Sequence, residues 1–215
     1  MSTVSQPVPG GVTAPKHRTP AIETTTGPVA MNTPQKMGTR LWAPTFLMAL
    51  IGFGIAIVLA AIRAGEVDGG SVADLETLRH LVPGFMFLGF TAVFASVSFA
   101  IARILGVFRV GGGKIQDDIG KGVHTLKMPA TAKAMLGLMM IGMIAVALGA
   151  IAHLVVGFRI GDGSESELAT SERWFLFSEG IRRLGVGMYL LGITFGLVTI
   201  VQVVKFQSAR IRELV

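Results

Sequence analysis

Two of the four histidines, His80 and His153, are the side chains best suited to chemistry. An imidazole can hold haem iron or another metal, and two imidazoles at one depth on neighbouring helices could do so together. His153 lies inside a long apolar stretch and His80 immediately precedes another, so both are expected near the same end of two helices. Two interpretations stay open. The pair either binds a cofactor, haem b or a metal completed by a loop carboxylate, or forms hydrogen bonds between helices.

Other chemistry is poorly represented. The chain has no cysteine, which excludes thiolate metal sites, cysteine-ligated iron–sulfur clusters and c-type haem attachment. The segment 111–114, Gly-Gly-Gly-Lys, lacks the spacing of a phosphate-binding loop. No arrangement of nucleophile, base and acid is visible, so we expect no cofactor beyond the haem alternative and no catalytic activity of the chain itself. It could still belong to an enzyme complex.

Four long stretches without a charged side chain would position the histidines. They cover residues 43–62, 81–102, 134–158 and 184–204. A hydrocarbon core of about 30 Å requires roughly 20 apolar residues in a helix, and each stretch reaches that length. A central Lys or Arg would cost about 3 kcal/mol. The sequence therefore predicts an all-α polytopic membrane domain over 41–215, with four transmembrane helices in a bundle.

Residues 1–40 differ in composition from the rest, since they hold six of the nine prolines and a single acidic residue. Such a segment buries too little apolar surface to offset the entropy of ordering it. We expect a cytoplasmic tail that is disordered or held by a partner.

The distribution of basic residues predicts the orientation. Eleven Lys and Arg flank the side of the termini and the 103–133 connection, against six on the other side, which places both termini in the cytoplasm of a cell (plasma or inner) membrane. The net charge of +6 is therefore expected to contact anionic lipids rather than nucleic acid. The 103–133 connection is predicted to be flexible, with its basic side chains at lipid head groups: Arg103, Arg109, Lys114, Lys121, Lys127 and Lys133.

The opposite, outer side is expected to carry acidic loops. Ser164 and Glu167 fit a capping box that begins a helix at the lipid–water boundary. Arg79, Arg182 and Arg183 are expected to pair with loop acids at this face, and the alternative is an outer site where an anion or a partner docks. We expect no charged side chain at mid-membrane depth, which argues against a proton relay or an ion-coupled transporter.

A partial internal repeat accompanies these loops. Residues 79–91 match residues 182–194 at six of thirteen positions. The match predicts two tandem helical hairpins related by an axis along the membrane normal.

Small residues recur at the spacing of helix–helix contacts. Such residues allow close backbone approach in lipid, either inside the bundle or against a partner helix. The positions predicted to pack are Gly52, Ala56, Ala60, Ala92, Ser96, Ala145, Gly149, Gly192 and Gly196.

These features favour a non-catalytic accessory or scaffolding subunit of a larger integral membrane complex, with a respiratory or other oxidoreductase complex as a candidate. Its partners would be other integral membrane subunits. The alternative is a haem- or metal-binding electron-transfer subunit using His80 and His153, and a small transporter or pore is a weaker third.

Overall fold

The computed structural model describes residues 24–26, 29–120, 123–161 and 163–212, and within these ranges the protein is almost entirely helical. The elements in chain order are β1 (Thr24–Thr26), α1 (Thr33–Gly65), α2 (Val72–Asp118), β2 (His124–Leu126), α3 (Ala130–Gly157) and α4 (Glu165–Arg212). The two short strands pair antiparallel, with Thr25 opposite Thr125.

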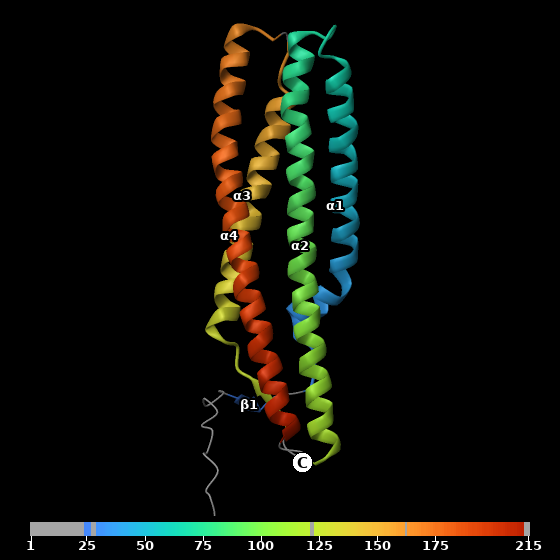
Figure 1. The fold of residues 1–215 in the computed structure, drawn as a ribbon, viewed down its shortest axis with the longest axis vertical. Helices are drawn as coiled ribbons and strands as arrows, with labels where there is room; N and C mark the ends of the chain where they lie inside the picture. The colour runs from blue at the N-terminus through green and yellow to red at the C-terminus, as the bar shows by residue number, and fades with distance from the viewer. Residues whose placement is uncertain (1–23, 27–28, 121–122, 162, 213–215) are drawn as a thin grey trace, which may run out of the picture.

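All four helices are long and apolar enough to span a membrane, with mean hydropathy between 2.1 and 2.6 over their most apolar windows. The predicted fold class, an all-α multi-pass bundle of four helices, is confirmed. The α1–α2 and α3–α4 connections lie together at one end, which we call the loop end (Figure 1). The strands and the last turns of α2 and α4 lie at the other, the terminal end.

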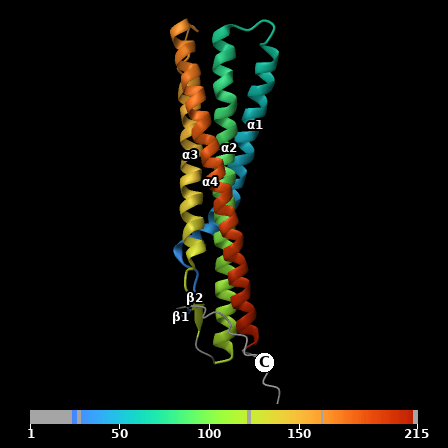
Figure 2. The ribbon, with the colours of Figure 1, turned by 60° about the vertical axis from the view of Figure 1, so that its left-hand side comes forward.

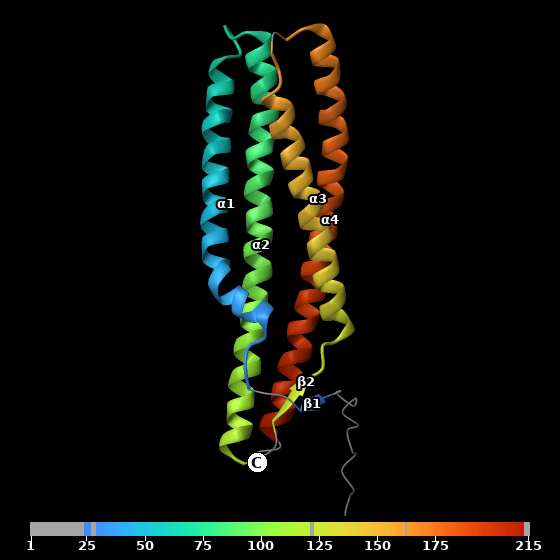
Figure 3. The ribbon, with the colours of Figure 1, turned by 180° about the vertical axis from the view of Figure 1, so that it is seen from behind.

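The bundle consists of two closely packed hairpins, α1–α2 and α3–α4, as the sequence predicts. Helix α2 also packs along α3 and contacts α4, whereas α1 packs mainly on α2. In Figures 1 and 3, α1 lies on one side of α2 while α3 and α4 lie on the other, and Figure 2 shows α4 crossing in front of α2. The core that can enclose a site is therefore formed by α2, α3 and α4.

Local sequence signals set the helix starts. Asn32 and Gln35 form a capping box at α1, where each side chain accepts from the backbone N–H of the other. Ser71 caps α2 by accepting from the N–H of Asp74. At α4, Glu167 reaches back to accept from the N–H groups of Gly161 and Gly163.

Helix α2 is longer than the sequence indicates. The flexible connection predicted from residue 103 is wrong over its first half, because the helix continues through the triple glycine to Asp118. Gly113 is buried there, and a Cβ at this position would lie 3.0 Å from Val29. Packing against the segment that precedes α1 thus keeps these glycines helical, although glycine has a low helix propensity.

The segment predicted as a tail falls mostly outside the described residues. Of its described part, 24–26 form β1 and 33–40 form the first turns of α1. Gly38 packs directly on α2, since a Cβ there would lie 2.5 Å from the carbonyl oxygen of Phe99. These residues are therefore part of the folded bundle.

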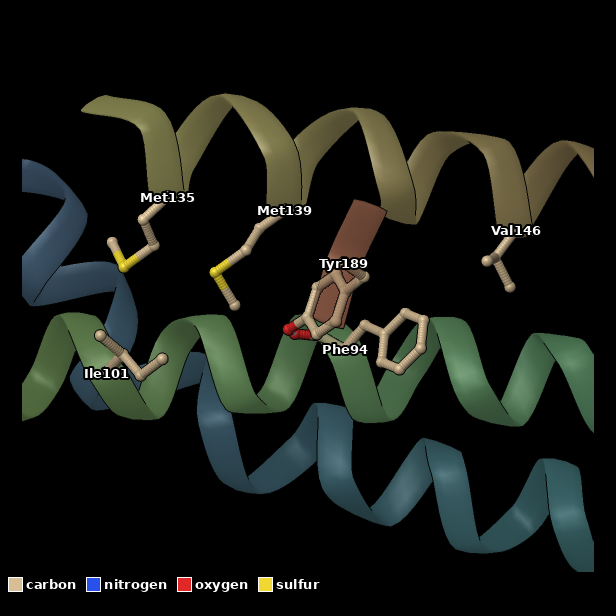
Figure 4. Packing of buried hydrophobic residues seen from close by; sticks show 6 residues of the cluster. All are labelled: Phe94, Ile101, Met135, Met139, Val146 and Tyr189. Atoms are coloured by element: carbon tan, nitrogen blue, oxygen red, sulfur yellow. The ribbon is translucent and has the colours of Figure 1, made fainter. Parts of the chain in front are cut away.

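The buried positions of α3 and α4 follow the spacing of packed membrane helices. They recur after alternating three and four residues, which places a continuous seam along each helix. Between α3 and α2, Met135, Met139 and Val146 contact the side of α2 that carries Phe94 and Ile101, with Tyr189 between them (Figure 4). The rings of Tyr189 and Phe94 are stacked, with centroids 3.8 Å apart.

Small-residue contacts fix the relative heights of the helices. Gly52 of α1 meets Gly89 of α2, and Gly84 of α2 meets Leu154 of α3. Gly89 lies five residues past Gly84 towards the terminal end, and Gly149 lies five residues before Leu154 in the same direction. Gly52, Gly89 and Gly149 therefore occupy one level, within about 5 Å of the midpoints of the first three predicted spans.

Candidate functional site

His80 and His153 face each other inside the α2–α3–α4 core. Both are buried, at 0% and 1% exposure, and their Nδ1 atoms are 3.0 Å apart. The sequence predicted that the two rings would lie at one depth on neighbouring helices, and the structure brings them into direct contact.

Two serines of α4 and one glutamate extend the pair into a chain of hydrogen bonds. Ser171 Oγ lies 2.7 Å from Nε2 of His80, and Ser178 Oγ lies 3.0 Å from Nε2 of His153. Ser171 donates its own proton to Oε1 of Glu76. All four ring nitrogens therefore have a partner within the protein.

This geometry dictates the proton positions for neutral rings. Because Ser171 donates to Glu76, its oxygen must accept from Nε2–H of His80. Nδ1 of His80 is then an acceptor, so His153 donates through Nδ1–H and accepts at Nε2 from Ser178. Ser178 also lies within bonding distance of the Phe175 carbonyl.

An aromatic ring and an ion pair close the site towards the loop end. Phe175 presents its ring nearly perpendicular to both imidazoles, at centroid distances of 5.7 Å from His80 and 5.3 Å from His153. The Arg79 guanidinium lies 4.5 Å from the centre of the same ring and 2.6 Å from a carboxylate oxygen of Glu172. The histidines are thereby separated from water on this side.

Arg182 is the second unusual group of the core. It is only 5% exposed, and its Nε and Nη1 atoms are buried without a hydrogen-bond partner among the described residues. Its guanidinium carbon lies 4.1 Å from the centre of the Phe87 ring, a cation–π contact. A buried guanidinium normally has its donors paired, so this one calls for an acceptor that the described chain does not supply.

The depth of Arg182 corrects the expectation that it pairs with loop acids at the outer face. A Cβ on Gly149 would clash with Cγ of Arg182, so the two residues are at one level. Gly149 is eight residues, about 12 Å, from the end of α3 at Gly157. Arg182 therefore lies level with Gly52 at the middle of α1, where no charge was expected. The midpoint of the charge-free stretch 184–204 is displaced from it by about 18 Å towards the terminal end.

The arrangement bears on cofactor binding. Two nitrogens on opposite sides of one metal ion are about 4 Å apart, since each metal–nitrogen bond is about 2 Å long. The facing Nδ1 atoms are closer than that, at 3.0 Å, and are hydrogen-bonded to each other. Over the described part of the chain, no group of three or more His, Asp or Glu side chains could hold a metal ion. Ligation by His80 and His153 would require both rings to turn.

Most of the predicted packing residues lie in helix contacts. Gly52 meets Gly89, while Gly192 and Gly196 meet Met139 and Met135. The other predicted positions differ in burial: Ala56, Ser96 and Gly149 are buried, Ala92 and Ala145 are half-buried, and Ala60 is exposed.

The basic residues predicted at lipid head groups lie near the terminal end. The guanidinium carbon of Arg103 is 5.4 Å from the centre of the Trp42 ring. Arg109 is half-buried and lines a cavity of about 540 Å³ between the start of α1 and the end of α4. Lys114, Lys127 and Lys133 are exposed, and Lys121 lies outside the described residues.

Sequence reasoning missed Glu76, Ser171 and Ser178, and it misplaced Arg182. A signal for the α4 residues exists: Ser171, Ser178, Arg182, Gly185 and Tyr189 repeat at intervals of seven, four, three and four. This is the period of a buried seam, so polar residues on it can be expected to face the neighbouring helices. Glu76 gives no comparable signal, because it sits in an acidic segment next to the loop.

Comparison with known proteins returns nothing. No family model, curated protein or solved structure matches this chain. The site must therefore be interpreted from its geometry alone.

Proposed function

We propose that this protein is a non-catalytic accessory or scaffolding subunit of a larger integral membrane complex, and that a transmembrane helix of another subunit docks on the outward face of α4. Arg183 is the observation that supports the proposal best. Its side chain is 80% exposed and pairs with Glu179, yet it follows Arg182 at the level of the middle of α1. Charged side chains at such depth face protein or a water-filled cavity rather than lipid, because exposure to hydrocarbon costs about 3 kcal/mol.

Two open glycines on the same face support the proposal independently. Gly180 and Gly187 are seven residues apart, so they lie on the same face of α4, which also carries Arg183 and Leu184. A Cβ at either glycine would have no atom within 4 Å. Glycine weakens a helix by about 1 kcal/mol relative to alanine. Its presence where this chain packs nothing is explained if a partner backbone approaches there.

The same proposal includes the orientation. With both termini in the cytoplasm of a cell membrane, the terminal end with Arg103, Lys114, Lys127 and Lys133 contacts anionic lipid, in accord with the positive-inside rule. The buried histidine chain would then lie in the outer half of the bundle, where it fastens α2, α3 and α4 to one another.

Site-specific photocrosslinking in intact membranes tests the docking face. A photoreactive residue replaces Leu184, which is 64% exposed between the two glycines, or Ile144 of α3, which is 50% exposed and serves as the matched control. We expect position 184 to give one protein adduct of defined mass and position 144 to give only lipid adducts. The added change Gly187→Leu should abolish the 184 adduct by blocking close approach.

Two results would count against the proposal. Adducts to lipid alone at position 184 would mean that this face is not covered by protein. Recovery of the wild-type chain only as a free monomer from a mild-detergent pull-down would exclude a stable complex.

An electron-transfer role for His80 and His153 is the second candidate, favoured by their direct contact. An absorption spectrum of the purified protein tests it. A haem Soret band that disappears in both single-histidine variants would support this role, and a colourless, metal-free preparation would exclude it.

A further inference from the structure

We infer that the pocket between α2 and α4 beside Arg182 binds a long-chain amphiphile with one anionic oxygen head group, namely a fatty acid carboxylate. The pocket has a volume of about 530 Å³, within the usual range for small-molecule sites. Its walls are the rings of Phe87, Phe90 and Phe94 together with Val186 and Leu190, and Arg182 contributes its main cationic group. The pocket shares Glu179 and Arg183 with the docking face proposed above, but the assignment of its ligand does not require a partner helix.

The head group is assigned from the unpaired donors of Arg182. Only 5% of the surface of Arg182 is exposed, and its Nε and Nη1 atoms have no acceptor among the described residues. The stacking of the guanidinium on Phe87, at 4.1 Å, holds it against the pocket wall. A carboxylate presents two oxygens to an arginine, which is the geometry that the guanidinium fork matches best.

The charge of the ligand follows from the neighbouring groups. Glu179 and Arg183 line the same pocket and are paired with each other. Glu179 also acts electrostatically on Arg182, so one carboxylate is shared between two arginines and the pocket keeps one net positive charge. A ligand with one negative charge neutralises it, whereas a neutral ligand leaves a buried charge uncompensated.

The body of the ligand follows from the remaining walls and from the depth. Three phenylalanine rings and two aliphatic side chains offer apolar contact and no hydrogen-bonding side chain. Leu190 is 55% exposed, so the pocket opens on the surface that faces the bilayer. Arg182 lies about 12 Å from the end of α3 along the helix, deeper than a phosphate head group at the interface reaches without deforming the bilayer. A single acyl chain with a small carboxylate fits this depth better than a phospholipid.

Native mass spectrometry of the full chain released from detergent micelles tests the site. The probes are palmitate, hexadecanol with the same chain length and no charge, and a dipalmitoyl phosphatidylglycerol. We expect the wild type to bind palmitate at least about tenfold more tightly than hexadecanol. Arg182→Gln should remove that preference. The matched control, Arg173→Gln, changes an exposed arginine of the same helix outside the pocket and should leave it intact.

A second variant keeps the charge and fills the space. Leu190→Trp narrows the pocket from its exposed rim, where the fold does not depend on the side chain, and should lower palmitate binding about tenfold with Arg182 unchanged. This variant decides the question if Arg182→Gln does not fold.

Three results would overturn the inference. They are equal binding of palmitate and hexadecanol to the wild type, unaltered palmitate binding in both pocket variants, and no binding of palmitate at all. Preferential binding of phosphatidylglycerol over palmitate would overturn the assignment to a fatty acid.

Discussion

Replacing Gly142 with alanine should loosen the α3–α4 hairpin. A Cβ at this position would lie 2.6 Å from the carbonyl oxygen of Gly185 and 2.8 Å from the backbone nitrogen of Tyr189. Both obstacles are backbone atoms of α4, so no side-chain rotation can relieve the clash. The helices must move apart by several tenths of an ångström.

The size of the effect can be worked from that contact. Overpacking against an immobile wall costs about 1–3 kcal/mol. The better helix propensity of alanine returns about 1 kcal/mol, which would mask part of the effect in a single measurement. Gly137→Ala removes this ambiguity, because Gly137 lies on the same helix and a Cβ there has no atom within 4 Å. The difference between the two variants isolates the clash and should be about 1–3 kcal/mol.

Unfolding in mixed micelles, followed by circular dichroism against increasing denaturing detergent, measures both variants beside the wild type. We expect Gly142→Ala to unfold at lower denaturant and Gly137→Ala to unfold at the wild-type value or above. Equal free energies of unfolding for the two variants would refute the close approach of α3 and α4 at this level.

Two further predictions concern buried hydrogen bonds. A double-mutant cycle with His80→Phe and His153→Phe should give a coupling energy of about 1–2 kcal/mol in denaturant unfolding, because each single change leaves the other ring without its partner. A coupling near zero would contradict the direct bond. Tyr189→Phe removes the hydroxyl that donates to the Phe94 carbonyl and lies 3.0 Å from Ser98. It should destabilise the protein by about 1 kcal/mol. Thermal unfolding in micelles checks this, and an unchanged midpoint would show that the hydroxyl contributes nothing.

The helix count and the hairpin arrangement could be predicted because they depend on properties local to each segment. A charge-free stretch of sufficient length has few alternatives to a membrane helix. The small residues that mark close contacts were also visible, as the meeting of Gly52 and Gly89 shows. The extension of α2 to Asp118 was missed because its glycines favour a connector by propensity. Contact between Gly113 and Val29 outweighs that preference.

The site was predictable only in part. That His80 and His153 lie at one depth follows from their positions in two stretches, whereas their hydrogen-bond partners depend on how α4 is aligned beside α3. The charge-free stretch 184–204 predicted that the midpoint of this stretch lies at the middle of the membrane. In the structure, the contact between Arg182 and Gly149 sets the height of α4, and this height places an arginine at the middle of the bundle. A rule based on the cost of charge in lipid cannot anticipate an arginine shielded by neighbouring helices.

The succession of contacts along the chain has a consequence for biogenesis. Each helix packs against the one that follows it, and α1 needs little beyond α2. The first hairpin can therefore assemble as soon as it leaves the translocon, before α3 has been synthesised. Ordering by such local partners makes folding fast and limits the time in which half-finished surfaces are open to aggregation. The packing of α2 on α3, with the imidazole contact in it, must wait for the third helix, and the serine hydrogen bonds must wait for the fourth.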